Sequence, residues 1–179
     1  MHTARRWLLG AVLLCAACGS GAPPGVVTDS PATAGATAPG EEAVERGPRI
    51  EVRLRPPDGA RAVTVRVEDA HDQPTRRVGL MHRRRIPPRG GMVFRFPDDR
   101  QGGFWMKDTL VPLSIAFFDG DGEVLAVLDM QPCQADPCPS YDPEVPYRGA
   151  LEVNQGFFDR VGLQPGWRVE LPGSLPAAS

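Results

Sequence analysis

Apolar and polar residues alternate along the first part of the folded region. Residues 50–54 and 63–67 carry an apolar side chain at every second position, which is the period of a half-buried strand. Pro56, Pro57 and Gly59 lie between the two segments, and this composition is typical of a turn. The pattern therefore predicts two strands joined by a turn.

Denser apolar runs predict further strands. A strand over residues 91–96 would place Met92, Phe94 and Phe96 on one face. Two apolar runs flank Asp119-Gly120-Asp121-Gly122 and predict a β-hairpin, because Asp and Gly tolerate the positive φ angles of such turns. The strands expected beyond residue 90 cover residues 91–96, 104–107, 113–118, 124–128, 150–154 and 167–171.

Two segments predict short helices. Residues 75–81 would direct Val78 and Met81 inward, and residues 155–161 form an amphipathic segment that stops at Gly162. Together with about eight strands, these segments predict a mainly β (β-rich α+β) fold, a compact antiparallel β-barrel-like domain. We expect this domain to cover residues 49–171, with a flexible tail over residues 172–179.

Residues 1–18 have the organisation of a signal peptide. Arg5 and Arg6 precede an apolar stretch over residues 7–14, which is too short to span a bilayer. Small residues then lead to Cys18, and this arrangement resembles a bacterial lipobox, in which the cysteine is lipidated. Because Cys15 stands where a lipobox usually has leucine, plain secretion is the alternative to lipidation at Cys18.

Residues 19–48 predict a disordered linker. They are rich in Gly, Ala, Pro, Ser and Thr, and they cannot bury enough apolar surface to fold. A flexible tether of about 30 residues reaches roughly 30 Å. The expected protein is exported to the cell envelope, binds the membrane through its lipid anchor and faces the periplasm. Gly19 replaces the aspartate that signals inner-membrane retention, which by resemblance favours the outer membrane.

The charge balance argues against a nucleic-acid binder. The chain has 20 Lys and Arg residues against 22 Asp and Glu residues, a net charge of −2, whereas nucleic-acid binders usually carry a basic surface. Arg83, Arg84 and Arg85 are consecutive. They predict a solvated loop, and an anion site is the alternative.

The single lysine of the chain lies within residues 103–113. Lys107 is followed by Asp108 and Thr109, and apolar residues flank this polar triplet. An ammonium group is a compact point charge, unlike the planar guanidinium fork of the abundant arginines. One interpretation is a buried strand that ends in a polar turn. The other is the rim of a pocket built on a rigid strand.

The same stretch resembles the signature of the bacterial and archaeal domain of unknown function 192 proteins. Residues 104–119 read FWMKDTLVPLSIAFFD, and the usual signature reads FWMKNT-x-xPLDIxF. The resemblance spans residues 63–171 and implies a β-rich fold with minor helices, while it leaves the biochemical role open. Asp108 and Ser114 stand where the family usually has Asn and Asp, so the two departures either compensate each other or mark an altered activity. The further agreeing pieces are residues 78–81, 91–94 and 151–154, with Gly156, Gly162 and Gly166.

The leading functional prediction is a binding module. It would capture a small ligand or a segment of an envelope protein in a pocket near Lys107. An enzyme that uses Lys107 as acid or base is the second class, and a structural envelope-interaction protein is the third. The sequence has no nucleophile-elbow motif, no P-loop and no dinucleotide-binding glycine pattern. The candidate binding residues are Met81, His82, Trp105, Lys107, Asp108, Thr109 and Ser114.

Two cysteines in a Pro-rich loop predict a disulfide. Cys133 and Cys138 lie close together in the sequence, and an oxidising compartment would favour their pairing. Redox activity is the alternative, but the spacing is not CxxC and no βαβ pattern surrounds it.

The sequence predicts neither a metal nor a cofactor. Residues 119–122 lack the remaining ligands of a calcium loop. Met92 and Met106 lie on apolar strands. Packing in the core is therefore favoured over a Cu(I) site that would combine them with Met81 and His82.

Overall fold

The structure is a computed structural model that describes residues 47–179. The chain divides into two units, Met1–Ala38 and Pro39–Ser179. The predicted signal peptide with Cys18 and nearly all of the predicted linker lie outside the described residues, so both stay predictions. No helix in the described part is long and apolar enough to cross a membrane.

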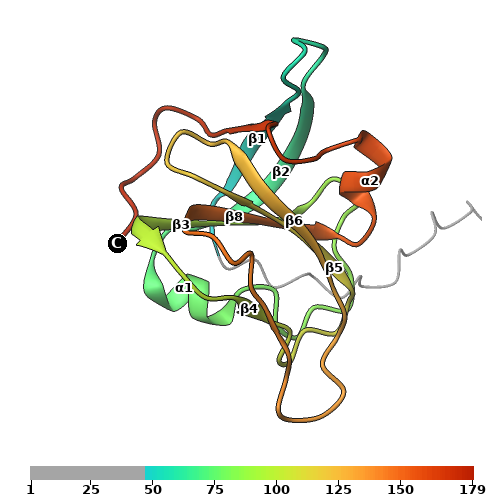
Figure 1. The fold of residues 1–179 in the computed structure, drawn as a ribbon. Coiled ribbons are helices and arrows are strands. Elements are labelled where there is room, and N and C mark those ends of the chain that lie inside the picture. The colour runs from blue at the N-terminus through green and yellow to red at the C-terminus, as the bar shows by residue number, and fades with distance from the viewer. Residues whose placement is uncertain (1–46) are drawn as a thin grey trace, which may run out of the picture. The chain divides into compact units, whose positions relative to one another are not determined.

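A seven-stranded sheet in the order β6-β5-β8-β3-β2-β1-β9 makes up most of the described region, and β4 pairs with β7 in a separate two-stranded sheet. Figure 1 labels β1 to β6 and β8. The large sheet curls into a half-barrel. Its two edges approach each other at a bridge between Glu123 and Arg168. The strands are β1 (Arg49–Arg55), β2 (Val63–Ala70), β3 (Gly91–Arg100), β4 (Phe104–Trp105), β5 (Leu113–Phe118), β6 (Val124–Met130), β7 (Ser140–Tyr141), β8 (Tyr147–Asn154) and β9 (Arg168–Glu170).

The mainly β fold class is confirmed, with one exception to antiparallel pairing. Strands β2 and β3 are parallel, in a register that sets Glu68 beside Met92. Parallel neighbours need a crossover connection, and the chain makes it through α1 (Gln73–Val78) and the loop before β3. This crossover places α1 beside β4 (Figure 1). Residues of both elements line the pocket described below.

The first helix begins and ends at residues suited to those positions. Asp72 precedes α1, and its side chain accepts a hydrogen bond from the Thr75 N–H at 2.8 Å. Gly79 follows the helix with φ 48°, and its N–H donates to the Thr75 carbonyl at 2.9 Å. The predicted helix extended to Met81, but the structure ends it at Val78. The reason is that the backbone turns at Gly79, whose positive φ glycine adopts without steric strain.

The second helix, α2 (Phe157–Val161), stops at Gly162 as predicted. Gly162 has φ 76°, and its N–H donates to the Asp159 and Phe158 carbonyls. Phe157 and Phe158 are both buried, so this short helix contributes mainly apolar packing.

Two apolar clusters cover the two faces of the large sheet. Strand β5 is buried on both: Leu113, Ile115 and Phe117 belong to one cluster, and Ala116 and Phe118 to the other. This follows from the alternation of side chains along a strand. The predicted core role of two methionines is confirmed, because Met92 and Met106 are 0% and 1% exposed.

The prediction of a solvated arginine loop is wrong for Arg83. Its guanidinium is buried and donates to both carboxylate oxygens of Glu68, at 2.5 and 2.6 Å. Glu68 is itself 3% exposed on β2. A charge removed from water in this way needs a close partner, and Arg83 supplies it, whereas Arg84 and Arg85 are exposed.

The last residues run beside α1 and β3. The Ser179 N–H donates to the His71 carbonyl at 2.9 Å, and the Arg95 guanidinium donates to the Pro176 carbonyl at 2.9 Å. These contacts do not test the flexibility expected for residues 172–179, which stays a prediction.

Candidate functional site

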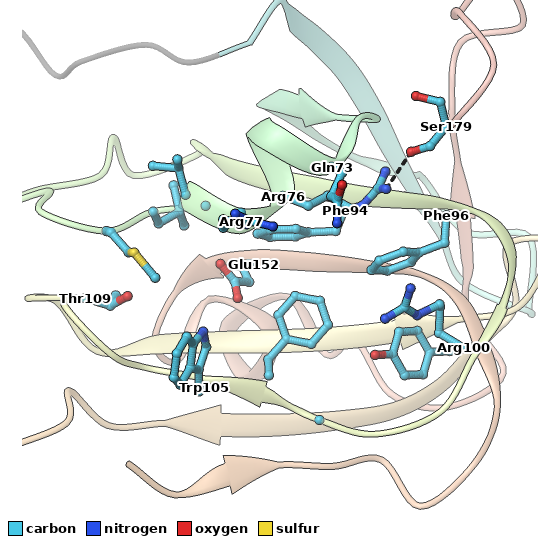
Figure 2. Close-up of a pocket in the computed structure, with 17 residues that line it drawn as sticks. Gln73, Arg76, Arg77, Phe94, Phe96, Arg100, Trp105, Thr109, Glu152 and Ser179 are labelled. Carbon is cyan, nitrogen blue, oxygen red and sulfur yellow. Dashed lines mark hydrogen bonds between the residues drawn. The ribbon is translucent and has the colours of Figure 1, made fainter. Parts of the chain in front are cut away.

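A pocket of about 500 Å³ opens between α1, β3, β4 and β8 (Figure 2). Its size lies in the range typical of small-molecule sites. The sheet and α1 build it from segments that are far apart in the sequence. It is lined by Gln73, Arg76, Arg77, Val78, Gly79, Leu80, Met81, Phe94, Phe96, Arg100, Gly103, Phe104, Trp105, Thr109, Tyr147, Glu152 and Ser179.

Glu152 is the only acidic side chain among these lining residues. It lies on β8, where its cross-strand neighbours are Met92 and Ile115, both fully buried. Figure 2 shows its side chain reaching into the pocket. The residue is 5% exposed, and among residues 47–179 nothing forms a hydrogen bond or an ion pair with its carboxyl.

The apolar surroundings of Glu152 change its acidity. Burial raises the pKa of this carboxyl from 4.5 to about 8, because the charged form is poorly solvated there. The group is therefore mostly protonated at neutral pH and presents an O–H donor. A strongly shifted acid in a cavity is a recognised mark of functional sites.

Aromatic rings in edge-to-face contact support the pocket. Phe104 packs edge-on against Phe94 and Phe117, with ring centroids 5.0 and 5.6 Å away. Tyr147 continues the cluster 4.9 Å from Phe117, and its O–H donates to the Gly102 carbonyl at 3.0 Å. Edge-to-face contacts of this kind are favourable between aromatic rings, so the rings of this wall support one another.

Trp105 differs from the other rings of the lining. It is 56% exposed, although an indole ring on a surface usually gains by burial. It follows Phe104 in β4, which pairs with β7 through Trp105 and Ser140. The short strand pairing therefore holds an open aromatic surface at the edge of the pocket.

Three arginines, Arg76, Arg77 and Arg100, also line the pocket. The Arg76 and Arg100 guanidinium groups lie 5.0 and 5.1 Å from the centroid of the same ring, Phe96. Arg76 also donates to the carbonyls of His71 and Arg95 and to an oxygen of Ser179. Burial, and next the nearby charge of Arg100, lower the pKa of Arg76.

The residues predicted from the sequence divide into two groups. Met81, Trp105 and Thr109 line the pocket, whereas Lys107 does not. His82 and Asp108 are exposed turn residues with φ 63° and 55°. The His82 N–H donates to the Asp108 carbonyl at 2.7 Å, so these two residues join loops next to the pocket.

Lys107 does not line the pocket, although it lies next to Trp105, which does. Its ammonium is 5.9 Å from the Trp105 ring and 3.1 Å from an Asp136 carboxylate oxygen. The two paired side chains are 39% and 70% exposed. The carboxylate that pairs with Lys107 is that of Asp136 and not that of the adjacent Asp108, and the pair connects the Trp105 segment to the loop between β6 and β7.

Ser114 lies away from the pocket, at the β5–β6 pair. It is 1% exposed, donates to the Asp129 carboxylate at 2.5 Å and accepts the Gly156 N–H at 3.0 Å. Asp129 is its direct neighbour across the strands. The hydroxyl therefore holds β5, β6 and the turn before α2 together.

Cys133 and Cys138 form a disulfide, with Cα atoms 5.5 Å apart. The bond closes the loop that carries Asp136. These three side chains are close enough together to be considered as metal ligands, but a cysteine in a disulfide is no thiolate and cannot ligate in that way. The described residues therefore place a structural crosslink beside Lys107.

A second hollow of about 750 Å³ lies beside β9. Its Arg148 pairs with Asp99 at 2.8 Å and its Glu170 pairs with Arg55 at 2.6 Å. These lining charges are already compensated, unlike the carboxyl of Glu152. The pocket at Glu152 is the stronger candidate for this reason.

The sequence analysis missed Glu152 and the arginines of the opening as site residues. The available signal was an acid within residues 150–154, an otherwise apolar stretch ending in Asn154. Alternation alone assigns such an acid to a solvated face. The structure instead covers this face with α1 and the segment around Met106.

Solved structures of other proteins share this fold. One, from Sinorhizobium meliloti 1021 and described as a proposed transcription regulator, is 34% identical, with a TM-score of 0.63, over 70% of this chain and 95% of that chain. Another, a protein of unknown function from Novosphingobium aromaticivorans DSM 12444, is 28% identical, with a TM-score of 0.59, over 78% and 94%.

Family membership follows from the sequence itself. Among curated proteins, no sequence matches the chain. The model of one protein family, DUF192, described as an uncharacterized ACR, matches residues 55–171. This range holds every strand from β2 to β9 and both helices. The chain belongs to the DUF192 family.

Proposed function

We propose that the domain is a binding module for a small ligand, held in the pocket whose inner end carries Glu152. The observation that carries this proposal is the carboxyl of Glu152: the residue is 5% exposed, its side chain faces a cavity, and the carboxyl has no partner among the described residues. Burying a polar group without a hydrogen bond costs about 1–3 kcal/mol in proteins. A ligand that supplies the missing hydrogen bond would recover part of this cost.

The frame around Glu152 suits such a ligand. The aromatic rings around Phe104 already pack against one another, so we expect binding to cost little side-chain entropy there. Trp105 offers an exposed ring at the edge. Thr109, at 7% exposure, adds a hydroxyl to the lining.

A melting-temperature screen with envelope metabolites tests the proposal, because a ligand of the native state stabilises it. The variants are Trp105→Ala and Glu152→Gln. Leu110→Ala is the matched control, since Leu110 is also an exposed apolar residue of this segment but does not line the pocket. We expect a metabolite to raise the melting temperature of the wild type and of the control, and to lose this effect in Trp105→Ala. An effect that persists in both pocket variants would place the binding elsewhere.

Lys107 enters this proposal as a positioning residue. Its pairing with Asp136 ties the loop closed by the disulfide to the segment that carries Trp105. We do not propose Lys107 as an acid or base, because Lys107 does not line the pocket.

Acid–base chemistry at Glu152 is a second candidate function. The observation in its favour is the pKa raised by burial to about 8, which suits a group that exchanges a proton near neutral pH. NMR spectra of any metabolite that stabilises the protein would reveal conversion over time. An unchanged metabolite after prolonged incubation with wild-type protein would leave binding as the function.

We further propose that the protein is exported and held at the membrane by lipid on Cys18. The support is the signal-peptide and lipobox-like pattern of residues 1–18. The anchor would place the domain in the envelope, facing the periplasm, at the outer membrane. The ligand would then be a small envelope molecule or a short segment of an envelope protein. The net charge of −2 gives no reason to propose a nucleic-acid partner.

A further inference from the structure

We infer that the pocket selects a small anion that carries a flat ring. The negative group would lie at Arg100 and Arg76, the ring against Trp105, and an acceptor atom at Glu152. This inference rests on the proposed binding function and adds the chemical class of the ligand.

The charge of the lining favours an anion. Arg76, Arg77 and Arg100 contribute three positive charges, and Glu152 is the only acidic side chain of the lining; the main-chain carboxylate of Ser179 at Arg76 offsets one of the three charges. Because burial raises the pKa of Glu152 to about 8, its carboxyl adds almost no negative charge at neutral pH. A pocket lined by one sign of charge attracts ligands of the opposite sign, so a cation would be repelled at the opening.

The two guanidinium groups at Phe96 form the anion site. They lie at similar distances from one ring, 5.0 and 5.1 Å from its centroid. Their proximity is unfavourable, because the charge of Arg100 contributes to the lowered pKa of Arg76. The Arg100 guanidinium has no hydrogen-bond or ion-pair partner within residues 47–179, so an anion would relieve this repulsion.

Arg76 already holds one oxygen acceptor at this place. It donates from Nη2 to an oxygen of Ser179 at 2.5 Å, which Figure 2 draws at the pocket edge. The geometry at Arg76 is therefore suited to an oxygen ligand. Arg100 supplies the free donors, and a guanidinium binds carboxylate or phosphate oxygens through paired N–H groups.

The remaining lining suits the rest of the ligand. Trp105 is 56% exposed, and a flat ring stacked on it would bury apolar surface on both partners. The protonated carboxyl of Glu152 then has an O–H to donate, which requires an acceptor on the ligand. A ring that carries both an acidic group and an acceptor meets all three conditions.

Three probes with one ring and different charge test the ring and the charge that the inference requires of the ligand. Indole-3-acetate is an anion, indole-3-acetamide is neutral and tryptamine is a cation. We expect calorimetric titration of the full chain at about pH 6.5 to show indole-3-acetate binding about tenfold or more tighter than the amide, a difference of about 1.4 kcal/mol. Tryptamine is expected to bind most weakly.

Two arginine variants locate the anion. Arg100→Ala should weaken indole-3-acetate about tenfold and leave the amide almost unchanged. Arg61→Ala is the control, because Arg61 is exposed and lies outside the pocket lining. Equal affinities of indole-3-acetate for the two variants would overturn the inference.

The pH dependence gives an independent readout. Between about pH 6.5 and about pH 9.5, Glu152 ionises while the facing Arg76, Arg77 and Arg100 keep their charge. Tyr147, the other titratable group of the lining, has a pKa raised first by burial. Indole-3-acetate should therefore bind more weakly at the higher pH in the wild type and show less change in Glu152→Gln.

The outcomes separate this inference from the binding function on which it rests. Tightest binding of tryptamine, or of the amide, with loss in Trp105→Ala would overturn the anion class and keep the pocket as a binding site. No binding of indole-3-acetate at millimolar concentration would also overturn the anion inference. In either case, the metabolite screen with Trp105→Ala remains a separate test of whether the pocket binds a ligand.

Discussion

Replacing Glu152 by Gln should stabilise the folded protein at neutral pH. Gln has nearly the same shape and carries no charge. In the wild type, the folded pKa lies at about 8 and the ordinary value is 4.5. Between these two values, the folded state keeps a proton that the unfolded state loses. The free energy of unfolding therefore falls as pH rises through this window.

The size of the effect follows from the shift. Each pH unit within the window changes the free energy of unfolding by about 1.4 kcal/mol. From pH 4.5 to neutral pH, the wild type should lose about 3 kcal/mol relative to Glu152→Gln. The loss should grow until the pH reaches about 8, where both states have lost the proton.

Urea unfolding of both proteins across this pH range measures the difference. Subtracting the two curves removes the contributions of every other titrating group, provided the slope with urea stays the same. Glu51→Gln is the control for the loss of one negative charge, because Glu51 is exposed on β1. A wild-type minus Glu152→Gln difference that stays constant with pH would show that the buried carboxyl is ionised in the folded protein, and the argument for this site would be wrong.

Three further predictions concern the anchor, the disulfide and the lysine. Cys18→Ser should move the protein from the membrane to the soluble fraction, and a wild type without acyl mass on its N-terminal peptide would contradict lipidation. Alkylation of the unreduced protein should leave Cys133 and Cys138 unmodified, as mass spectrometry can show; labelling of both would exclude the disulfide. Lys107→Ala should weaken ligand binding in the metabolite screen but cost less than about 1 kcal/mol of stability, because its pair with Asp136 is exposed. Lys107→Arg should not restore binding, since the planar fork differs from an ammonium, and full binding by Lys107→Ala would remove Lys107 from the site.

Alternation and turn chemistry were sufficient to predict most of the fold. Residues 50–54 and 63–67 lie within β1 and β2 as expected, and the Asp-Gly turn joins β5 to β6. Gly162 ends α2 as predicted. These features depend on local preferences, such as the period of a strand and the positive φ of glycine, and neighbours in the sequence determine them.

The sequence did not predict which charged residues, far apart in the chain, pair in the fold. Lys107 pairs with Asp136 rather than with Asp108, because β4 and β7 bring the disulfide loop to it. Arg83 is buried and paired with Glu68 rather than exposed to solvent. A charged residue in a loop has no local signal that distinguishes a buried partner from water, since only the tertiary packing brings the partner near.

The pocket shows the same division. The sequence by itself determined that Trp105 and Thr109 flank a lysine at the end of an apolar stretch, and both line the pocket. Only the tertiary structure decided that Glu152 lies beneath α1, between Met92 and Ile115. The period of a strand tells which face a side chain occupies, but whether that face meets water or another element depends on the crossover from β2 to β3. That crossover is a long-range choice of the folded chain, and it turns an ordinary acid into a buried, protonated one.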